Sequence, residues 1–74
     1  MVEADALVRL GTVIGELRRA KGISQERFAD SIGMHRAQYG KIERGLTNVT
    51  LTTLIRIAAG LGTTLAALLV DADL

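Results

Sequence analysis

Apolar residues recur at three- and four-residue intervals along most of the chain, the spacing that places side chains on one face of an α-helix. The first such run predicts a helix over roughly 5–20, and Gly22 after it is a typical helix stop. The apolar positions that define this run share one stripe: Leu7, Leu10, Ile14 and Leu17.

Two short helices separated by a glycine turn are predicted in the middle of the chain, over roughly 25–31 and 35–43. Ser24 precedes the first of them as a cap. Gly33 lies in the turn, where a positive φ costs a glycine little. Gly45 ends the second helix. The positions expected to face inward are all apolar: Phe28, Ala29, Ile32, Met34, Tyr39 and Ile42.

Two further helices are predicted over roughly 51–61 and 65–70. Thr50 caps the first of these and Gly62 ends it, while a Thr-Thr pair opens the second. No segment has the alternating pattern of a strand, so we expect one all-α domain over 1–74, built as a compact five-helix bundle. The residues of the fourth helix expected to face the core are Leu51, Leu54, Ile55, Ala58 and Leu61.

The small size of the chain bears on whether it works alone. A domain of 74 residues buries only about 60% of the surface of its unfolded form, so a second copy is a natural source of further burial. The last two helices carry more leucine than one small core needs, which favours a dimer interface. The alternative is that these leucines only cover the core of the single chain. The predicted interface residues are Leu61, Leu65, Leu68 and Leu69.

Composition argues against several classes of function. The chain has no Cys and one His, so neither a disulfide framework nor a metal cluster is expected. We find no paired carboxylates in register and no phosphate-binding glycine loop, and we expect neither an enzyme nor a cofactor. No apolar run nears the roughly 20 residues of a membrane span, and the N-terminus lacks the basic start of a secretory signal. We therefore expect a cytoplasmic protein.

Charge is unevenly distributed along the chain, although the net charge is only +1. The segment 18–56 holds eight Lys or Arg residues against three acidic ones, and both ends of the chain are acidic. A basic centre between acidic ends is typical of a surface that binds a polyanion such as nucleic acid. The alternative is an ordinary solvated surface.

The two central helices and their turn have the pattern of a helix-turn-helix. Ala29 lies where the two helices approach most closely, and a larger side chain there would separate them. Gly33 fits a turn too tight for a Cβ. The apolar positions on both sides stay in register over the whole motif, which makes the pattern far more specific than a glycine turn alone.

The run LRRAKGISQERFADSIGMHRAQYGKIERGLTNVTLTTLIRIAAGLG resembles the phage-repressor (Xre-like) helix-turn-helix proteins. The resemblance covers about residues 7–70 and implies a lambda-repressor-like DNA-binding fold. Within that family, the short length and the ERGLTNVTL junction are most similar to the controller proteins of restriction–modification systems. Those are small homodimeric regulators, which implies double-stranded operator DNA and a second copy of the chain as partners.

The helix over 35–43 is then the recognition helix, whose outer face enters a major groove about 12 Å wide. Arg36 in its first turn is suited to guanine, although a phosphate contact is the alternative. Ala37 is suited to a thymine methyl group or simply to clearance. Gln38 and Lys41 suit either a base or a phosphate. His35 is a poor helix cap and is either a phosphate contact or an ordinary surface residue.

The resemblance also assigns residues to the DNA backbone and to the interior. A glutamine at the start of the second helix binds a phosphate in the family, which implies that role for Gln25. The family also implies a structural salt bridge between Arg18 and Glu43. Tyr39 replaces an aliphatic residue, and we expect its ring in the core with its hydroxyl at the rim. The further phosphate contacts expected are Arg19, Lys21, His35, Gly40, Arg44 and Asn48.

Several functions fit these features. The first is a homodimeric transcription regulator that acts as the autoregulatory controller of a restriction–modification system. The second is an antitoxin or a phage or plasmid repressor of the same fold. The third, from another class, is a protein-interaction module that does not bind DNA. Activation by such a regulator requires contact with RNA polymerase, for which Glu26 and Asp30 are candidate residues.

Overall fold

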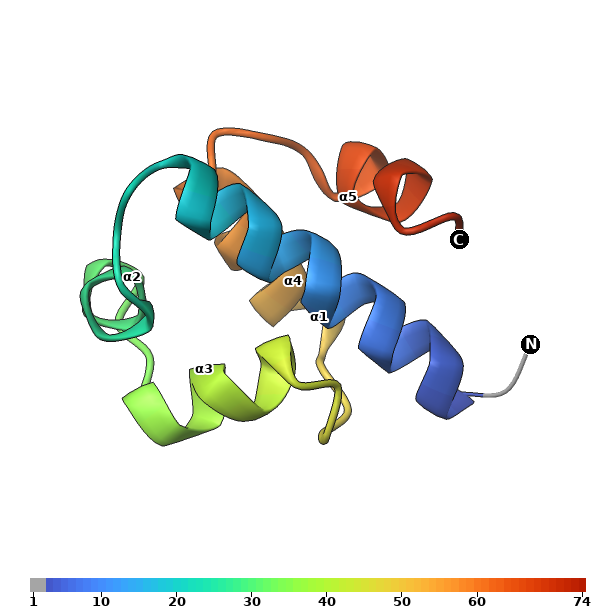
Figure 1. Cartoon of the computed structure of the whole chain (residues 1–74), viewed down its shortest axis with the longest axis horizontal. Coiled ribbons are helices and arrows are strands. Elements are labelled where there is room, and N and C mark those ends of the chain that lie inside the picture. The colour runs from blue at the N-terminus through green and yellow to red at the C-terminus, as the bar shows by residue number, and fades with distance from the viewer. Residues whose placement is uncertain (1–2) are drawn as a thin grey trace.

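The computed structural model describes residues 3–74, which form five helices and no strands. All-α architecture is therefore confirmed, and each helix begins and ends within two residues of its predicted position. The long first helix runs through the middle of the molecule, with α3 on one side of it and α5 on the other (Figure 1). The five helices are α1 (Glu3–Ala20), α2 (Gln25–Ser31), α3 (Arg36–Glu43), α4 (Leu51–Gly60) and α5 (Leu65–Asp71).

Helix caps fix the starts of three of these helices. The side-chain oxygens of Ser24, Thr50 and Thr64 each accept a hydrogen bond from the backbone N–H three residues later. Such bonds satisfy N–H groups that have no partner inside the helix. Of the Thr-Thr pair predicted to open the last helix, Thr64 is thus the capping residue.

Helices α1 and α3 cross at close range because glycines lie at their contact. Gly11 of α1 is buried, and a Cβ there would overlap the backbone carbonyl groups of Ile42 and Glu43. Gly45, two residues after the end of α3, has a φ of 70°, and a Cβ there would lie 2.7 Å from the Cα of Val8. The C-terminal end of α3 is thereby fixed against α1.

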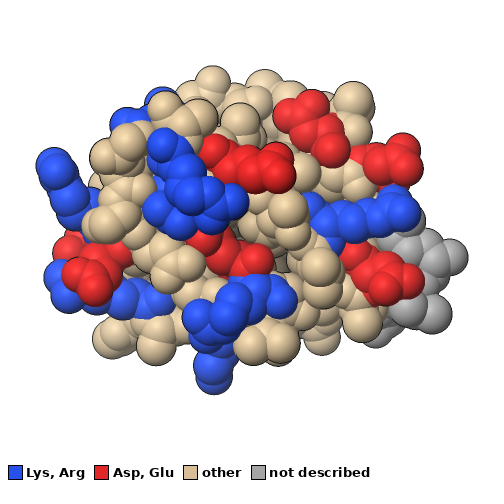
Figure 2. All heavy atoms as spheres, in the orientation of Figure 1, with Lys and Arg blue, Asp and Glu red and all other residues tan. Residues whose placement is uncertain are grey.

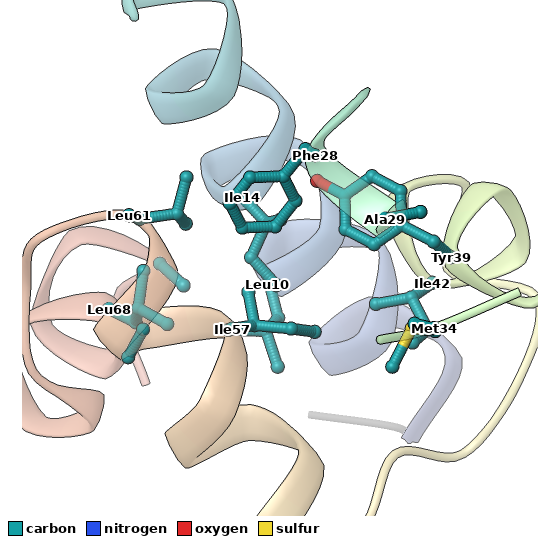
Figure 3. Packing of buried hydrophobic residues seen from close by; sticks show 12 residues of the cluster. Leu10, Ile14, Phe28, Ala29, Met34, Tyr39, Ile42, Ile57, Leu61 and Leu68 are labelled. Carbon is teal, nitrogen blue, oxygen red and sulfur yellow. The ribbon is translucent and has the colours of Figure 1, made fainter. Parts of the chain in front are cut away.

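The hydrophobic core joins side chains from all five helices (Figure 3). At its centre the rings of Phe28 and Tyr39 pack with their centroids 5.2 Å apart, which connects α2 to α3. Ile14 of α1 and Ile57 of α4 are completely buried beside them. The core residues are Leu10, Ile14, Phe28, Ala29, Met34, Tyr39, Ile42, Ile57, Ala58, Leu61, Leu68 and Ala72.

The predicted inward face of α4 was wrong at two positions. Leu51 is 63% exposed and Ile55 is 51% exposed. The stripe of α4 that meets the core instead follows Leu54, Ile57, Ala58 and Leu61. Ile55 lies about 100° around the helix from Leu54, because an α-helix has 3.6 residues per turn, and its side chain consequently faces solvent.

Two of the four predicted dimer-interface residues belong to the core of the single chain. Leu61 is 6% exposed and Leu68 is completely buried, so neither side chain offers surface to a second copy. Leu68 is buried because the face of α5 that carries it packs against α1 and α4. Leu65 and Leu69 are half-buried, and Val70 on the outer side of α5 is 76% exposed.

The last residues of the chain are fastened to α1. The Nη1 atom of Arg9 donates to the backbone carbonyl of Asp73 at 3.3 Å and lies 3.4 Å from its carboxylate. This contact holds the segment after α5 beside the first helix. Taken singly, none of the helices in residues 3–74 is long and apolar enough to cross a membrane.

Candidate nucleic-acid interface

The turn between α2 and α3 has the geometry of a helix-turn-helix. Gly33 has a φ of 69°, and the N–H of Met34 donates to the carbonyl of Ala29 at 2.9 Å, which folds the chain back against α2. Ala29 is completely buried at the contact between the helices, and Met34 is 6% exposed. The turn therefore fixes the direction in which α3 leaves α2, as the sequence predicted.

A buried ion pair holds α3 against α1. The Nε atom of Arg18 donates to Oε2 of Glu43 at 2.6 Å, and Nη2 donates to Oε1 at 3.1 Å. Both side chains are less than 10% exposed. Arg18 also donates to the carbonyl of Ile23 at 2.8 Å, and Gln25 donates to Oε1 of Glu43 at 2.8 Å. Glu43 thus connects α1, α2 and α3 through a bidentate pair and an amide.

The charges of this network are stabilised by its own hydrogen bonds. Burial acts to raise the pKa of Glu43, but the hydrogen bonds and charge of Arg18 and the hydrogen bond from Gln25 outweigh it and hold that pKa below its usual value. The hydrogen bond to Glu43 likewise raises the pKa of Arg18. Both groups are therefore charged across the physiological pH range.

Tyr39 lies deeper than its sequence suggested. Its ring is completely buried, and its hydroxyl lies inside the cluster rather than at the rim (Figure 3). By distance and angle the hydroxyl has no hydrogen-bond partner among residues 3–74, although the charges of Glu43 and Arg18 are close enough to affect it. Burial raises the pKa of Tyr39 far above its usual value, so the hydroxyl is neutral. The expectation of a rim hydroxyl was wrong because α1 covers this side of α3.

Arg36 begins α3 and is paired with acidic residues of α2. Its Nη2 atom lies 3.0 Å from the carboxylate of Asp30, and its Nη1 atom lies 3.6 Å from that of Glu26. The hydrogen bond to Asp30 raises the pKa of Arg36. The sequence did not predict these contacts, although Glu26 and Asp30 are four residues apart and share one face of α2.

The remaining outer face of α3 is slim and carries no acidic residue. Ala37, Gln38 and Lys41 are exposed. His35 occupies the N-cap position and makes no side-chain cap hydrogen bond, and it is exposed. Figure 2 shows basic side chains over α3 and the C-terminal half of α1, with acidic side chains beside them at the α2 end and in the middle of this face, and further acidic side chains toward α5. The exposed face of α3 is thus shaped and charged for close approach of a polyanion.

Gly40 does not form part of this exposed face, contrary to its predicted phosphate contact. The residue is buried, because the guanidinium of Arg44 and the amide of Gln25 lie over it. Arg44 itself is exposed at the C-terminal cap of α3. Any approach to Gly40 therefore passes through these two side chains.

The other predicted phosphate contacts lie at different distances from α3. Arg19 is exposed, and its Nη1 atom lies near Gly15 at the contact of α1 with Glu43. Asn48 is exposed in the loop after α3. Lys21 instead extends toward Gly62, at the turn between α4 and α5, so the structure does not bring it together with the α3 residues.

These features define the class of the protein as a helix-turn-helix transcriptional regulator. The chain belongs to the helix-turn-helix family HTH_3, which matches residues 14–68. It is 43% identical over 70 residues to the control protein C.MunI of a Mycoplasma species, covering 93% of this chain and 95% of that protein. It is 44% identical over 52 residues to the control protein C.SmaI of Serratia marcescens, covering 70% of this chain and 62% of that protein.

A solved structure of a controller protein agrees with these sequence relatives. The fold is similar to that of the restriction-modification controller protein C.AhdI from Aeromonas hydrophila, with a TM-score of 0.80 and 40% identity. The similarity covers 84% of this chain and 94% of that one. The recognised family and the controller-like relatives agree with the resemblance found in the sequence.

Proposed function

We propose that this protein is the controller of a restriction–modification system, which binds operator DNA as a homodimer and regulates its own gene. The observation that carries the proposal is the outer face of α3. That face is slim, carries Arg36, Gln38 and Lys41 and no acid, and is held rigidly by the buried Arg18–Glu43 pair. A recognition helix needs this combination of close approach and fixed orientation.

In this proposal the first turn of α3 reads the bases. Arg36 leaves Asp30 and Glu26 and donates to guanine O6 and N7, a contact worth about 1–3 kcal/mol of discrimination. Ala37 approaches a thymine methyl group, and Gln38 and Lys41 reach a base or a phosphate. The backbone contacts come from Gln25, Arg19, Arg44, His35 and Asn48.

The proposed dimer uses apolar residues of α4 and α5. Leu65 and Leu69 are retained from the sequence prediction, and the exposed Ile55 and Val70 extend the surface. In a two-fold dimer the same patch meets itself. The two copies of α3 then read half-sites about one helical turn, or roughly 34 Å, apart.

Control of restriction and modification genes is supported by the relatives. The sequence similarity to the control protein C.MunI extends over almost the full length of this chain. Contact with RNA polymerase through Glu26 or Asp30 requires these carboxylates to separate from Arg36, against which both lie in the free protein.

A gel-shift titration on DNA from immediately upstream of the gene, with random DNA as competitor, tests this function. We expect wild-type binding to survive the competitor and Arg36→Ala to lose about tenfold or more in affinity, the worth of one bidentate base contact. Arg9→Gln is the matched control, since it removes one charge whose exposed partner is Asp73. Wild-type binding no stronger than to random DNA would contradict the controller function and would favour a protein-interaction module.

A further inference from the structure

Gly40 lies in the interior of a helix and has no backbone reason to be glycine. The glycines with positive φ in residues 3–74 are at 22, 33, 45 and 62, so position 40 has an ordinary helical conformation. Alanine is favoured over glycine at such a site, because glycine loses more conformational freedom on folding. Backbone conformation therefore does not explain the glycine, and the reason must lie in what surrounds position 40.

Polar side chains fill the space that a side chain at position 40 would take. A Cβ on Gly40 would lie 3.2 Å from Nη1 and 3.8 Å from Nη2 of Arg44, and 3.6 Å from Oε1 of Gln25. Arg44 follows Gly40 by four residues and is thus its neighbour on the helix surface. The guanidinium lies back across α3 because nothing projects from position 40.

Gln25 and Arg44 differ in how they are held. The amide of Gln25 is fixed, since its Nε2 atom donates to Glu43 at 2.8 Å and Glu43 is held by Arg18. Arg44 has no carboxylate partner among the described side chains of residues 4–74. Arg44 as a residue is exposed, and its guanidinium therefore has donors left for an external anion. A planar guanidinium matches the oxygens of a phosphate.

We propose that Gly40 is a positioning residue for DNA binding, which allows the Arg44 guanidinium to lie across α3 beside Gln25 and donate to one phosphate of the DNA backbone. The proposal rests on the proposed DNA-binding function and adds to it a residue that never touches the DNA. It replaces the prediction from the sequence that Gly40 itself contacts a phosphate.

Gly40→Ala separates DNA binding from folding. Its Cβ would press only on the end of the Arg44 side chain, which can move away, and would lie in ordinary van der Waals contact with the Gln25 amide, so we expect a melting temperature equal to or above that of the wild type. Displacement of Arg44 should weaken operator binding by about tenfold, the worth of one charge-assisted hydrogen bond. The slope of log affinity against log salt should become shallower by about 1, as for the loss of one phosphate contact.

A double-mutant cycle with Arg44→Ala identifies the route of the effect. Arg44→Ala alone should lose affinity and salt dependence to the same extent as Gly40→Ala. Adding Gly40→Ala to Arg44→Ala should then cost nothing further, because the side chain that Gly40 positions is already gone.

The outcomes distinguish this inference from the function on which it rests. Wild-type protein that does not bind operator DNA would overturn both. A wild type that binds, together with a Gly40→Ala variant of equal affinity and salt slope, would overturn this inference alone. So would an Arg44→Ala variant that binds like the wild type, or costs from the two substitutions that simply add, since additivity means that the Cβ meets the DNA directly.

Discussion

At the scale of single residues, Glu43 connects three helices through one carboxylate. It accepts two hydrogen bonds from Arg18 and one from Gln25, and its side chain is only 5% exposed. A buried ion pair is costly to break on one side only, because the remaining charge then lacks a partner. The orientation of α3, and with it the face offered to DNA, depends on this carboxylate.

Glu43→Gln is therefore expected to lower the free energy of unfolding by about 3–5 kcal/mol, since it leaves the buried Arg18 charge without its partner. Urea denaturation followed by circular dichroism measures the loss. Glu16→Gln on the exposed side of α1 is the matched control and should change stability by less than about 0.5 kcal/mol. Equal stabilities of the two variants would mean that the pair contributes nothing.

The difference in stability between the wild type and Glu43→Gln should also depend on pH. The pKa of Glu43 is lowered in the folded protein from its usual value of 4.5, so its contribution is complete above that pH. The contribution is lost as the pH falls through the lowered value, because protonation of Glu43 then accompanies unfolding. The stability difference between wild type and Glu43→Gln should accordingly shrink in acid below about pH 4.5.

At the scale of helices, the sequence predicted almost every boundary, because the signals are local. The apolar spacing, the capping oxygens of Ser24 and Thr50, and the glycines that follow the first four helices act within a few residues. The prediction of the inward face of α4 was wrong at Leu51 and Ile55. The side of a helix that is buried depends on the elements packed against it, which the local sequence does not specify.

The candidate site was predictable to a similar degree. The Arg18–Glu43 pair followed from the family resemblance, and the exposed face of α3 followed from its residues. The contact of Arg36 with Asp30 was not predictable, because it depends on the angle that the turn imposes between α2 and α3. The role of Gly11 was missed for the same reason, since a close crossing of two helices leaves no local signal.

Gly11→Ala tests that crossing. The new Cβ would overlap backbone atoms of α3, which cannot rotate away as a side chain can. We expect the free energy of unfolding to fall by at least about 1–3 kcal/mol, the usual cost of overpacking, despite the better helix propensity of alanine. Urea denaturation measures the change, with the exposed Thr12→Ala as the neighbouring control. A Gly11→Ala variant as stable as the wild type would show that α3 can shift away from α1 without cost.

At the scale of the whole molecule, the apolar surface of α4 and α5 is the feature that the single chain leaves uncovered. Ile55 and Val70 are 51% and 76% exposed, although Leu61 at the end of α4 and Leu68 of α5 are in the core. A domain this small gains much from burying such a surface in a second copy. In the proposed function dimerisation and DNA recognition are linked, because only a dimer presents two recognition helices to one operator.

Ile55→Asp and Val70→Asp should each produce a folded monomer, since both side chains lie outside the core and a charge in a self-complementary patch meets its own copy. Sedimentation equilibrium measures the change, and operator affinity should fall by about a hundredfold because the second half-site no longer binds as part of the same complex. Leu46→Asp, in the loop after α3, is the control for oligomeric state, since it adds the same charge at a residue 67% exposed.

Leu68→Ala distinguishes the core from the interface, because removing a completely buried side chain should cost about 2–5 kcal/mol of stability. Wild-type protein that sediments as a monomer, or Asp variants that remain dimeric, would place the dimer contact on a different surface or exclude it.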